Sequence, residues 1–268
     1  MNRWSVRLAL IIVCVLAMVH VHRHPGDGLG HVFRGTTFCL RCGERSSGGE
    51  TGSARIMLPV DASFQLRQSD LRYPVALTTH LGDRAPELLS VLGNLEILQR
   101  KTLALFCSVH CPGNLIVQTY DLAHKLRRAG VTIIGGFHSP MERQCLAILL
   151  RSPHPVIVCP ARSLPKRVPA EFHQPLEEGR LLLLSPFNEA VNRADEETAR
   201  QRNRFVAALA DQIFAAYAAP NSNTECFCRE ILAWRKPLYT FAGDANQNLL
   251  ALGAKPINPN DLSQAQLA

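Results

Sequence analysis

The segment from residue 101 to residue 142 constrains the fold of this chain more than any other. It begins with the apolar run Thr102–Phe106, which has the length and density of a strand buried on both faces. Apolar residues then recur at helical spacing over Leu115–Arg128, and the last turn is basic, as helix C-termini favour. A second buried strand is expected at Val131–Ile134, ended by Gly135–Gly136. The order of strand, helix and strand predicts a βαβ unit with a right-handed crossover.

The same alternation of strand and helix continues toward the C-terminus. It is typical of an α/β fold with a doubly wound, mostly parallel, Rossmann-like sheet. A change in composition near Met57 places this domain at residues 57–262, followed by a tail at residues 263–268. Further strands are expected at 156–159, 181–184, 212–218 and 237–241, and helices at 143–150, 196–209, 224–234 and 246–252.

Residues 1–56 are expected to form a poorly structured N-terminal extension. They contain an apolar segment at residues 8–21, preceded by Arg3 and Arg7. This segment is shorter than the roughly twenty residues that a helix needs to span a bilayer. Three interpretations stay open: a membrane anchor, a signal peptide, and a start assigned upstream of the true one.

The chain has nine cysteines, an odd number that argues against a complete disulfide framework. Several fall in or beside the expected buried strands, where free cysteines act as small hydrophobic residues in a reducing cytoplasm. We therefore expect a cytoplasmic protein, with an N-terminal anchor as the alternative. Cys39 and Cys42 have the spacing of a zinc knuckle, but no second pair completes four ligands. We expect no metal site and no cofactor.

Four loops are expected to meet at one edge of the sheet, at residues 107–114, 135–142, 185–204 and 219–225. In open α/β sheets this carboxyl edge binds ligands, and the helix N-termini there favour phosphate. The alternative is that the same small polar residues only form turns and cap helices. The candidate phosphate-binding residues in these loops are Ser108, Gly135, Gly136, Ser139, Ser222, Asn223 and Thr224.

Three arginines and one asparagine near the start of the expected helix 196–209 complete the candidate site: Arg200, Arg202, Asn203 and Arg204. Guanidinium groups pair with phosphate and stack on bases. A net charge of +7 and a pI near 9.1 fit a polyanionic partner. The acids at residues 195–197 leave open that this is a solvated charged helix face.

Catalytic residues are harder to identify. His138 and Ser139 follow an expected strand, and Glu142 lies close to both, but sequence cannot show that the three converge as a catalytic triad. We therefore assign no catalytic residue and expect that the protein is not an enzyme. If it is one, Glu142 and Glu225 are the catalytic candidates.

From Tyr73 to Ile257 the chain resembles the Rossmann-like domain of the DNA-processing protein A family (DprA, also called Smf). The strongest match is residues 202–211, RNRFVAALAD, to the family's Arg-Asn-Arg-Ile-Ile-Ala-Gly-Leu-Ser-Asp. Four weaker matches accompany it: Phe106–Ser108 at the family's Gly-Ser-Arg turn, residues 134–142 at its Ser-Gly-x-Ala-Arg-Gly-Ile-Asp motif, Asn221–Thr224 at its Ser-Gly-Ser turn, and Leu252–Ala254 at its closing Gly-Ala.

The resemblance implies a mediator that binds single-stranded DNA and loads a RecA-type recombinase in recombination or DNA uptake, with a homodimer as a further expectation. The chain departs from the family at two arginines, where it has Val109 and, approximately, Ser139. It also lacks a recognisable N-terminal helical domain and C-terminal winged helix. The wider superfamily includes lysine-decarboxylase-like phosphoribohydrolases, so a nucleotide-binding or nucleotide-hydrolysing enzyme is the alternative. A third interpretation is an interaction module that has lost both activities.

Overall fold

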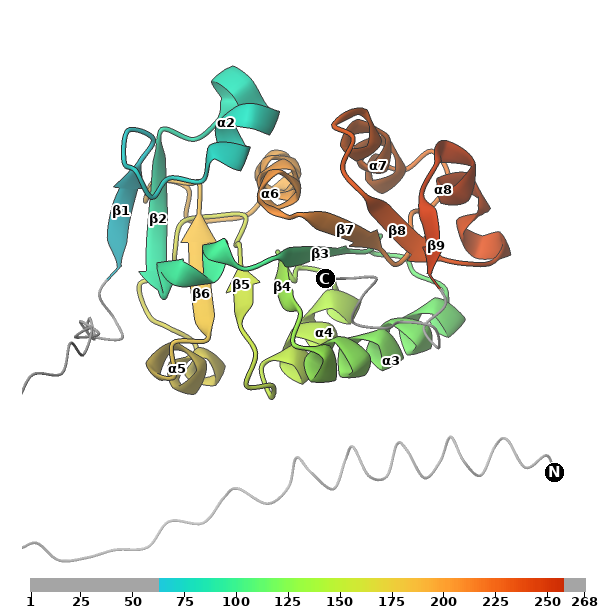
Figure 1. The fold of residues 1–268 in the computed structure, drawn as a ribbon, viewed down its shortest axis with the longest axis horizontal. Helices are drawn as coiled ribbons and strands as arrows, with labels where there is room; N and C mark the ends of the chain where they lie inside the picture. Colours follow the sequence, from blue (N-terminus) through green and yellow to red (C-terminus); the bar gives the residue numbers. More distant parts are fainter. Residues whose placement is uncertain (1–62, 258–268) are drawn as a thin grey trace, which may run out of the picture. The chain divides into compact units, whose positions relative to one another are not determined.

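The structure is a computed structural model, and it describes residues 63–257 (Figure 1). Its nine strands form one sheet. The strands are β1 (Phe64–Arg67), β2 (Leu88–Gly93), β3 (Thr102–Phe106), β4 (Thr132–Gly135), β5 (Val156–Val158), β6 (Leu181–Ser185), β7 (Gln212–Ala215), β8 (Leu238–Phe241) and β9 (Lys255–Ile257). Their order in the sheet is β1-β2-β6-β5-β4-β3-β7-β8-β9.

The sheet is parallel from β6 to β9, and β2 pairs antiparallel with both β1 and β6. The chain runs from β3 outward to β6 on one side, and then returns to place β7 on the other side of β3. This reversal puts a topological switch point between the carboxyl ends of β3 and β7. Open α/β sheets bind ligands at such a point.

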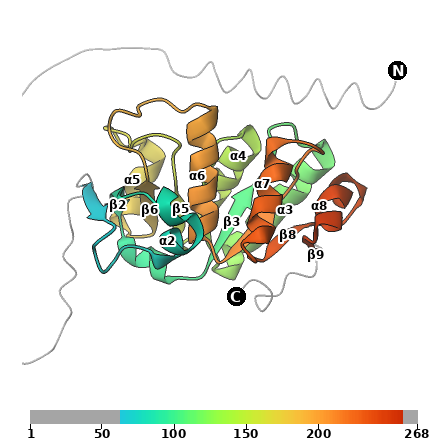
Figure 2. The same ribbon diagram turned by 90° about the horizontal axis from the view of Figure 1, so that it is seen from above.

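Helices cover both faces of the sheet (Figures 1 and 2). One face packs against α2 (Val75–Leu81), α6 (Glu196–Leu209), α7 (Asn223–Ala233) and α8 (Gln247–Leu252). The other face packs against α3 (Gly113–Ala129), α4 (Pro140–Leu149) and α5 (Ala170–Glu177). Short 3-10 helices lie at Gly82–Arg84, Leu95–Gln99 and Asp244–Asn246.

The central strands are buried on both faces because successive side chains point to opposite sides. In β3, Ala104 and Phe106 belong to the core under α6 and α7, whereas Leu103 and Leu105 belong to the core under α3 and α4. The four leucines of β6 divide in the same way. A continuous apolar strand therefore fills two cores at once, which is the physical basis of the doubly wound architecture.

The prediction of a doubly wound, mostly parallel α/β sheet is confirmed. The pattern missed β1, β2 and β9 of the strands, together with α2 and α5. The strand expected at 212–218 was too long, because β7 ends at Ala215 and the chain then turns toward α7. No helix within residues 63–257 is both long and apolar enough to cross a membrane. The apolar segment 8–21, the pair Cys39 and Cys42 and the tail 263–268 lie outside the described residues.

Candidate nucleic-acid interface

The loops after β3 and β7 are joined at the switch point. The Ser108 N–H donates to the carbonyl of Tyr217 at 2.9 Å. The Ser108 hydroxyl accepts a hydrogen bond from the Ala219 N–H at 3.3 Å, and its residue is buried. Ser108 therefore fixes the rim of the sheet, and Val109, with 67% of its surface exposed, is the first residue of this loop that faces solvent.

The β4–α4 loop is organised by the carboxylate of Glu142, which is 7% exposed. Its Oε2 accepts from the N–H groups of His138 at 2.9 Å and Ser139 at 3.1 Å, and its Oε1 accepts from the Cys107 N–H at 3.1 Å. The Ser139 hydroxyl completes a capping box by accepting from the Glu142 N–H. Glu142 thus ties the loops after β3 and β4 together, and its carboxylate is occupied by three backbone donors.

The start of α7 is built in a similar way. Ser222 is the N-cap and accepts from the Glu225 N–H at 3.2 Å. The Glu225 carboxylate accepts from the Asn248 amide and from the N–H of Asn221, whose φ of 59° is left-handed. These two hydrogen bonds, with the Asn248 bond foremost, lower the pKa of Glu225 below its ordinary value. The two carboxyl groups suggested for an enzyme, Glu142 and Glu225, therefore both accept hydrogen bonds from neighbouring loop and helix residues.

The three arginines of α6 point in different directions. Arg200 is exposed and forms ion pairs with Glu196 and Glu197 of its own helix. The Arg204 Nε donates to both carboxylate oxygens of Glu230 at 2.9 Å, which links α6 to α7. Both guanidinium groups are therefore already paired with carboxylates of α6 and α7, and Glu196, a partner of Arg200, also accepts from Asn223 at the start of α7.

Arg202 lies inside the carboxyl edge and is only 4% exposed. Its Nη1 donates to the Cys159 carbonyl at 3.1 Å, and its Nε donates to the Asn203 side-chain oxygen at 2.9 Å. Burial lowers the pKa of Arg202, and the nearby Glu142 partly opposes this change. No carboxylate of the described residues lies within ion-pair distance of Arg202, so a positive charge sits beneath the loops after β4 and β5.

Gly136 makes the position of Arg202 sterically feasible. A Cβ atom at Gly136 would lie 1.6 Å from the Arg202 Nη1. The preceding Gly135 is the last residue of β4 and packs near Phe137. The structure therefore brings together Gly136, Arg202 and Asn203. Asn223 instead donates to Glu196 at 3.1 Å, and Thr224 is half-buried in the first turn of α7.

Sequence reasoning missed a second group of basic residues at this edge. Arg162, Lys166 and Arg167 lie in the loop that leaves β5, and Arg193 lies in the loop that leaves β6. All four are exposed, and none forms an ion pair with another residue of the described part. The two loops are joined by a hydrogen bond from the Ser163 N–H to the Val191 carbonyl at 2.8 Å. The available signal was basic residues in the loops that follow two expected strands.

The chemistry of this edge suits a polyanion more than a metal ion. Residues 63–257 contain no group of three or more His, Cys, Asp or Glu residues that could hold a metal. The edge offers the guanidinium and ammonium groups just described, and the start of α3, which has no side-chain cap. Uncapped N–H groups and cations are both donors that phosphate accepts.

Comparisons with known proteins support the same interpretation. Residues 65–265 match the family model described as DNA recombination-mediator protein A. A search of curated proteins finds no significant match. The solved structures that share the fold include two DprA proteins. DNA processing protein A (DprA) from Streptococcus pneumoniae is 19% identical, with a TM-score of 0.61 over 74% of this chain and 72% of that chain. DprA from Helicobacter pylori, studied for its single-stranded DNA binding mode, is 22% identical, with a TM-score of 0.60 over 74% of this chain and 93% of that chain.

Proposed function

Because this chain belongs to the DNA recombination-mediator protein A family, we propose that it binds single-stranded DNA along the carboxyl edge of its sheet. The observation that carries this proposal is the group of four exposed cations Arg162, Lys166, Arg167 and Arg193, to which we refer as the basic rim. In the basic rim no acidic partner of the described residues neutralises these charges. A phosphate backbone supplies the missing negative charge.

The other parts of the site have different tasks in this proposal. Arg202 adds positive potential from below the loops, while its two hydrogen bonds hold the Cys159 and Asn203 segments in place. The N–H groups at the start of α3 complement the basic rim. Ser108, Ser139 and Ser222 fix the loops that carry these groups, because their hydroxyls already accept backbone hydrogen bonds.

The test is the binding of a fluorescent oligo(dT) strand measured across a range of salt concentrations. For single strands the logarithm of the binding constant falls with the logarithm of salt by about 0.7 per neutralised phosphate, so four contacts give a slope of about −2.8. Lys166→Glu with Arg167→Glu should weaken binding and flatten this slope. Binding that does not depend on salt would contradict the proposal.

The matched control is Arg100→Glu with Lys101→Glu. These two adjacent, exposed residues lie just before β3, at the opposite end of that strand from the site. The control changes the net charge by the same amount as the variant in the basic rim. It should leave the salt slope nearly unchanged if the contacts are local, whereas equal effects would indicate that only the overall charge matters.

We further propose that the protein transfers its strand to a RecA-type recombinase, that it acts as a homodimer, and that it works in the cytoplasm. The name of the family as a recombination mediator supports the first expectation. The six described cysteines are all free thiols, which is typical of a reducing compartment. Recombinase filament formation on coated single strands tests the transfer, and analytical ultracentrifugation tests the dimer. A monomer at all concentrations would contradict the dimer without affecting the DNA proposal.

A further inference from the structure

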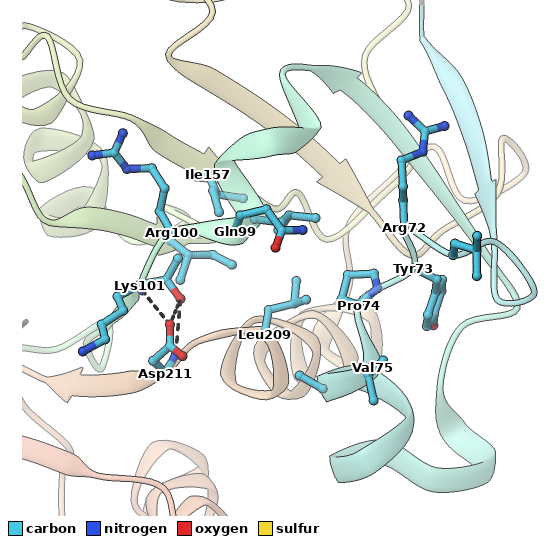
Figure 3. A pocket seen from close by; sticks show the side chains of 15 residues that line it. Arg72, Tyr73, Pro74, Val75, Gln99, Arg100, Lys101, Ile157, Leu209 and Asp211 are labelled. Atoms are coloured by element: carbon cyan, nitrogen blue, oxygen red, sulfur yellow. Dashed lines mark hydrogen bonds between the residues drawn. The ribbon is translucent and has the colours of Figure 1, made fainter.

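A cavity of about 410 Å³ opens near the amino end of β3, on the face that packs against α2 and α6 (Figure 3). It lies between the segment 71–76, which leads into α2, and the segment 98–102, which leads into β3. Its apolar lining includes Ile134, Ile157 and Leu209. The cavity therefore lies at the amino edge of the parallel strands, and the basic rim lies at their carboxyl edge.

Two polar side chains of the lining, Asp211 and Tyr73, form hydrogen bonds with neighbouring residues. Asp211 is the only acidic residue among the described residues that line the cavity, and its Oδ2 accepts from the N–H and the hydroxyl of Thr102 at 2.7 and 3.1 Å. The Tyr73 hydroxyl donates to the Pro86 carbonyl at 2.6 Å, and its residue is 5% exposed. Burial raises the pKa of Tyr73 to about 12, so this hydroxyl stays protonated. These hydrogen bonds hold the walls in place. Asp211 is exposed, and its single carboxylate is outnumbered by the three basic residues of the described lining, Arg72, Arg100 and Lys101.

The rim of the cavity combines cations with exposed apolar side chains. Arg72, Arg100 and Lys101 are exposed and form no ion pair within residues 63–257. Leu71 is fully exposed and Val75 is 74% exposed, although both are large apolar residues. Exposed apolar side chains beside a cavity whose opening carries positive charge are typical of a surface that binds another protein.

We propose that this cavity binds an acidic segment of a partner protein, with one aliphatic or aromatic side chain of that segment placed in the cavity. The partner's carboxylates would pair with Arg72, Arg100 and Lys101, and its apolar residue would contact Leu71, Val75 and the aliphatic lining. The inference goes beyond the proposed DNA binding and does not depend on it.

The apolar groups favour a peptide over a second nucleic-acid strand. A phosphate backbone gains nothing from Leu71 and Val75, and sequence-independent binding of single strands relies on aromatic rings that stack on bases. The aromatic residue of the cavity lining is Tyr73, whose side chain is buried.

The experiment is a selection of random octapeptides displayed on phage against the full-length protein, with counter-selection on Arg100→Glu with Lys101→Glu. We expect enrichment of acidic peptides that contain one or two aliphatic or aromatic residues. A peptide so selected, labelled with fluorescein, should bind the charge-reversed variant about tenfold more weakly or worse, because like charges across an interface are strongly unfavourable. No enrichment, or enrichment of basic or neutral peptides, would overturn the proposal.

A second variant tests the apolar part of the site. Leu71→Ser with Val75→Ser changes two exposed residues, so the fold should be kept, and peptide affinity should still fall severalfold. Lys166→Glu with Arg167→Glu is the matched control and should leave the peptide affinity unchanged. Competition by oligo(dT) for the peptide would instead identify the cavity as part of the DNA path and overturn the assignment to a protein partner. Failure of DNA binding alone leaves the peptide result intact, so the two proposals are tested separately.

Discussion

Gly136 and Arg202 pack so closely that the arginine fits only because residue 136 has no side chain. The buried guanidinium occupies the volume that a side chain at Gly136 would need, as the 1.6 Å distance shows. The guanidinium is also held by the Cys159 carbonyl and Asn203, so it cannot simply turn away. The family motif around residue 202 is therefore explained here by packing within the carboxyl edge as well as by charge.

This coupling gives a prediction for stability. Gly136→Ala should lower the free energy of unfolding by about 1–3 kcal/mol, the usual cost of inserting a methyl group into a packed site. In an Arg202→Ala background the same substitution should cost much less, because the displaced group is gone. Urea unfolding of the four proteins measures both effects. An equal cost in the two backgrounds would show that the two residues do not interact.

Val109 gives a second prediction at the scale of a single residue. The resemblance to the DprA family places it at the arginine of the Gly-Ser-Arg turn, and it is 67% exposed. Val109→Arg should therefore strengthen oligo(dT) binding and make the salt slope steeper by about 0.7, the value for one additional phosphate contact on a single strand. Val117→Arg, which changes another exposed valine on α3, is the control. An identical gain at both positions would argue against a specific contact at residue 109.

At the scale of elements, the helices that leave the carboxyl edge fall into two groups. Glu142, Asp195 and Glu225 accept backbone hydrogen bonds at the starts of α4, α6 and α7. The helices α3 and α5 have no side-chain cap. The chain thus neutralises three of its helix N-termini with its own carboxylates, which stabilises those helices by favourable interaction with the helix dipole.

The cap of α7 predicts a dependence of stability on pH. The pKa of Glu225 is lower in the folded chain than its ordinary value of 4.5, so the ionised form stabilises the fold above that value. This contribution is lost as the pH falls below 4.5 and through the folded pKa. Glu225→Gln should lower the free energy of unfolding at pH 7 by about 1.5–3 kcal/mol, the range for hydrogen bonds to a charged group.

Urea unfolding at pH 7 and at pH 3 checks this expectation. The difference between the wild-type protein and Glu225→Gln should shrink at the lower pH, because pH 3 lies below the ordinary pKa of 4.5 and the unfolded chain then binds a proton at Glu225. Glu189→Gln changes an exposed glutamate in the β6–α6 loop and serves as the control. A difference that is the same at both pH values would show that the charge of Glu225 does not contribute to stability.

Whole-molecule architecture was largely predictable, because buried parallel strands and amphipathic helices have strong local patterns. The expected helix 196–209 has the observed bounds of α6, since Asp195 provides a clear N-cap. The strands β1 and β2 were missed because they are partly exposed and held by antiparallel pairing with distant residues, and β1 has only four residues. The helix α5 was missed because it contains Pro175.

The candidate site was less predictable than the fold. Residues two apart on an α-helix point about 200° away from each other, so Arg200, Arg202 and Arg204 cannot all face one rim. The acids beside Arg200 are visible in the local sequence, but Glu230 and Cys159, the partners of Arg204 and Arg202, lie in distant segments that the local sequence does not reveal. The basic rim was missed for a related reason, because only the sheet order places the loops after β5 and β6 next to each other.

The carboxylates that cap α4, α6 and α7 have a consequence for how a strand is held and released. Those helix starts already contain an internal anion, so in the proposed binding mode the strand contacts mainly the flexible side chains of the basic rim, with the uncapped start of α3 beside them. Such contacts do not distinguish one base from another. The strand dissociates from them readily when another protein binds the same sugar-phosphate backbone. Contacts of this kind suit the proposed transfer of the strand to a recombinase.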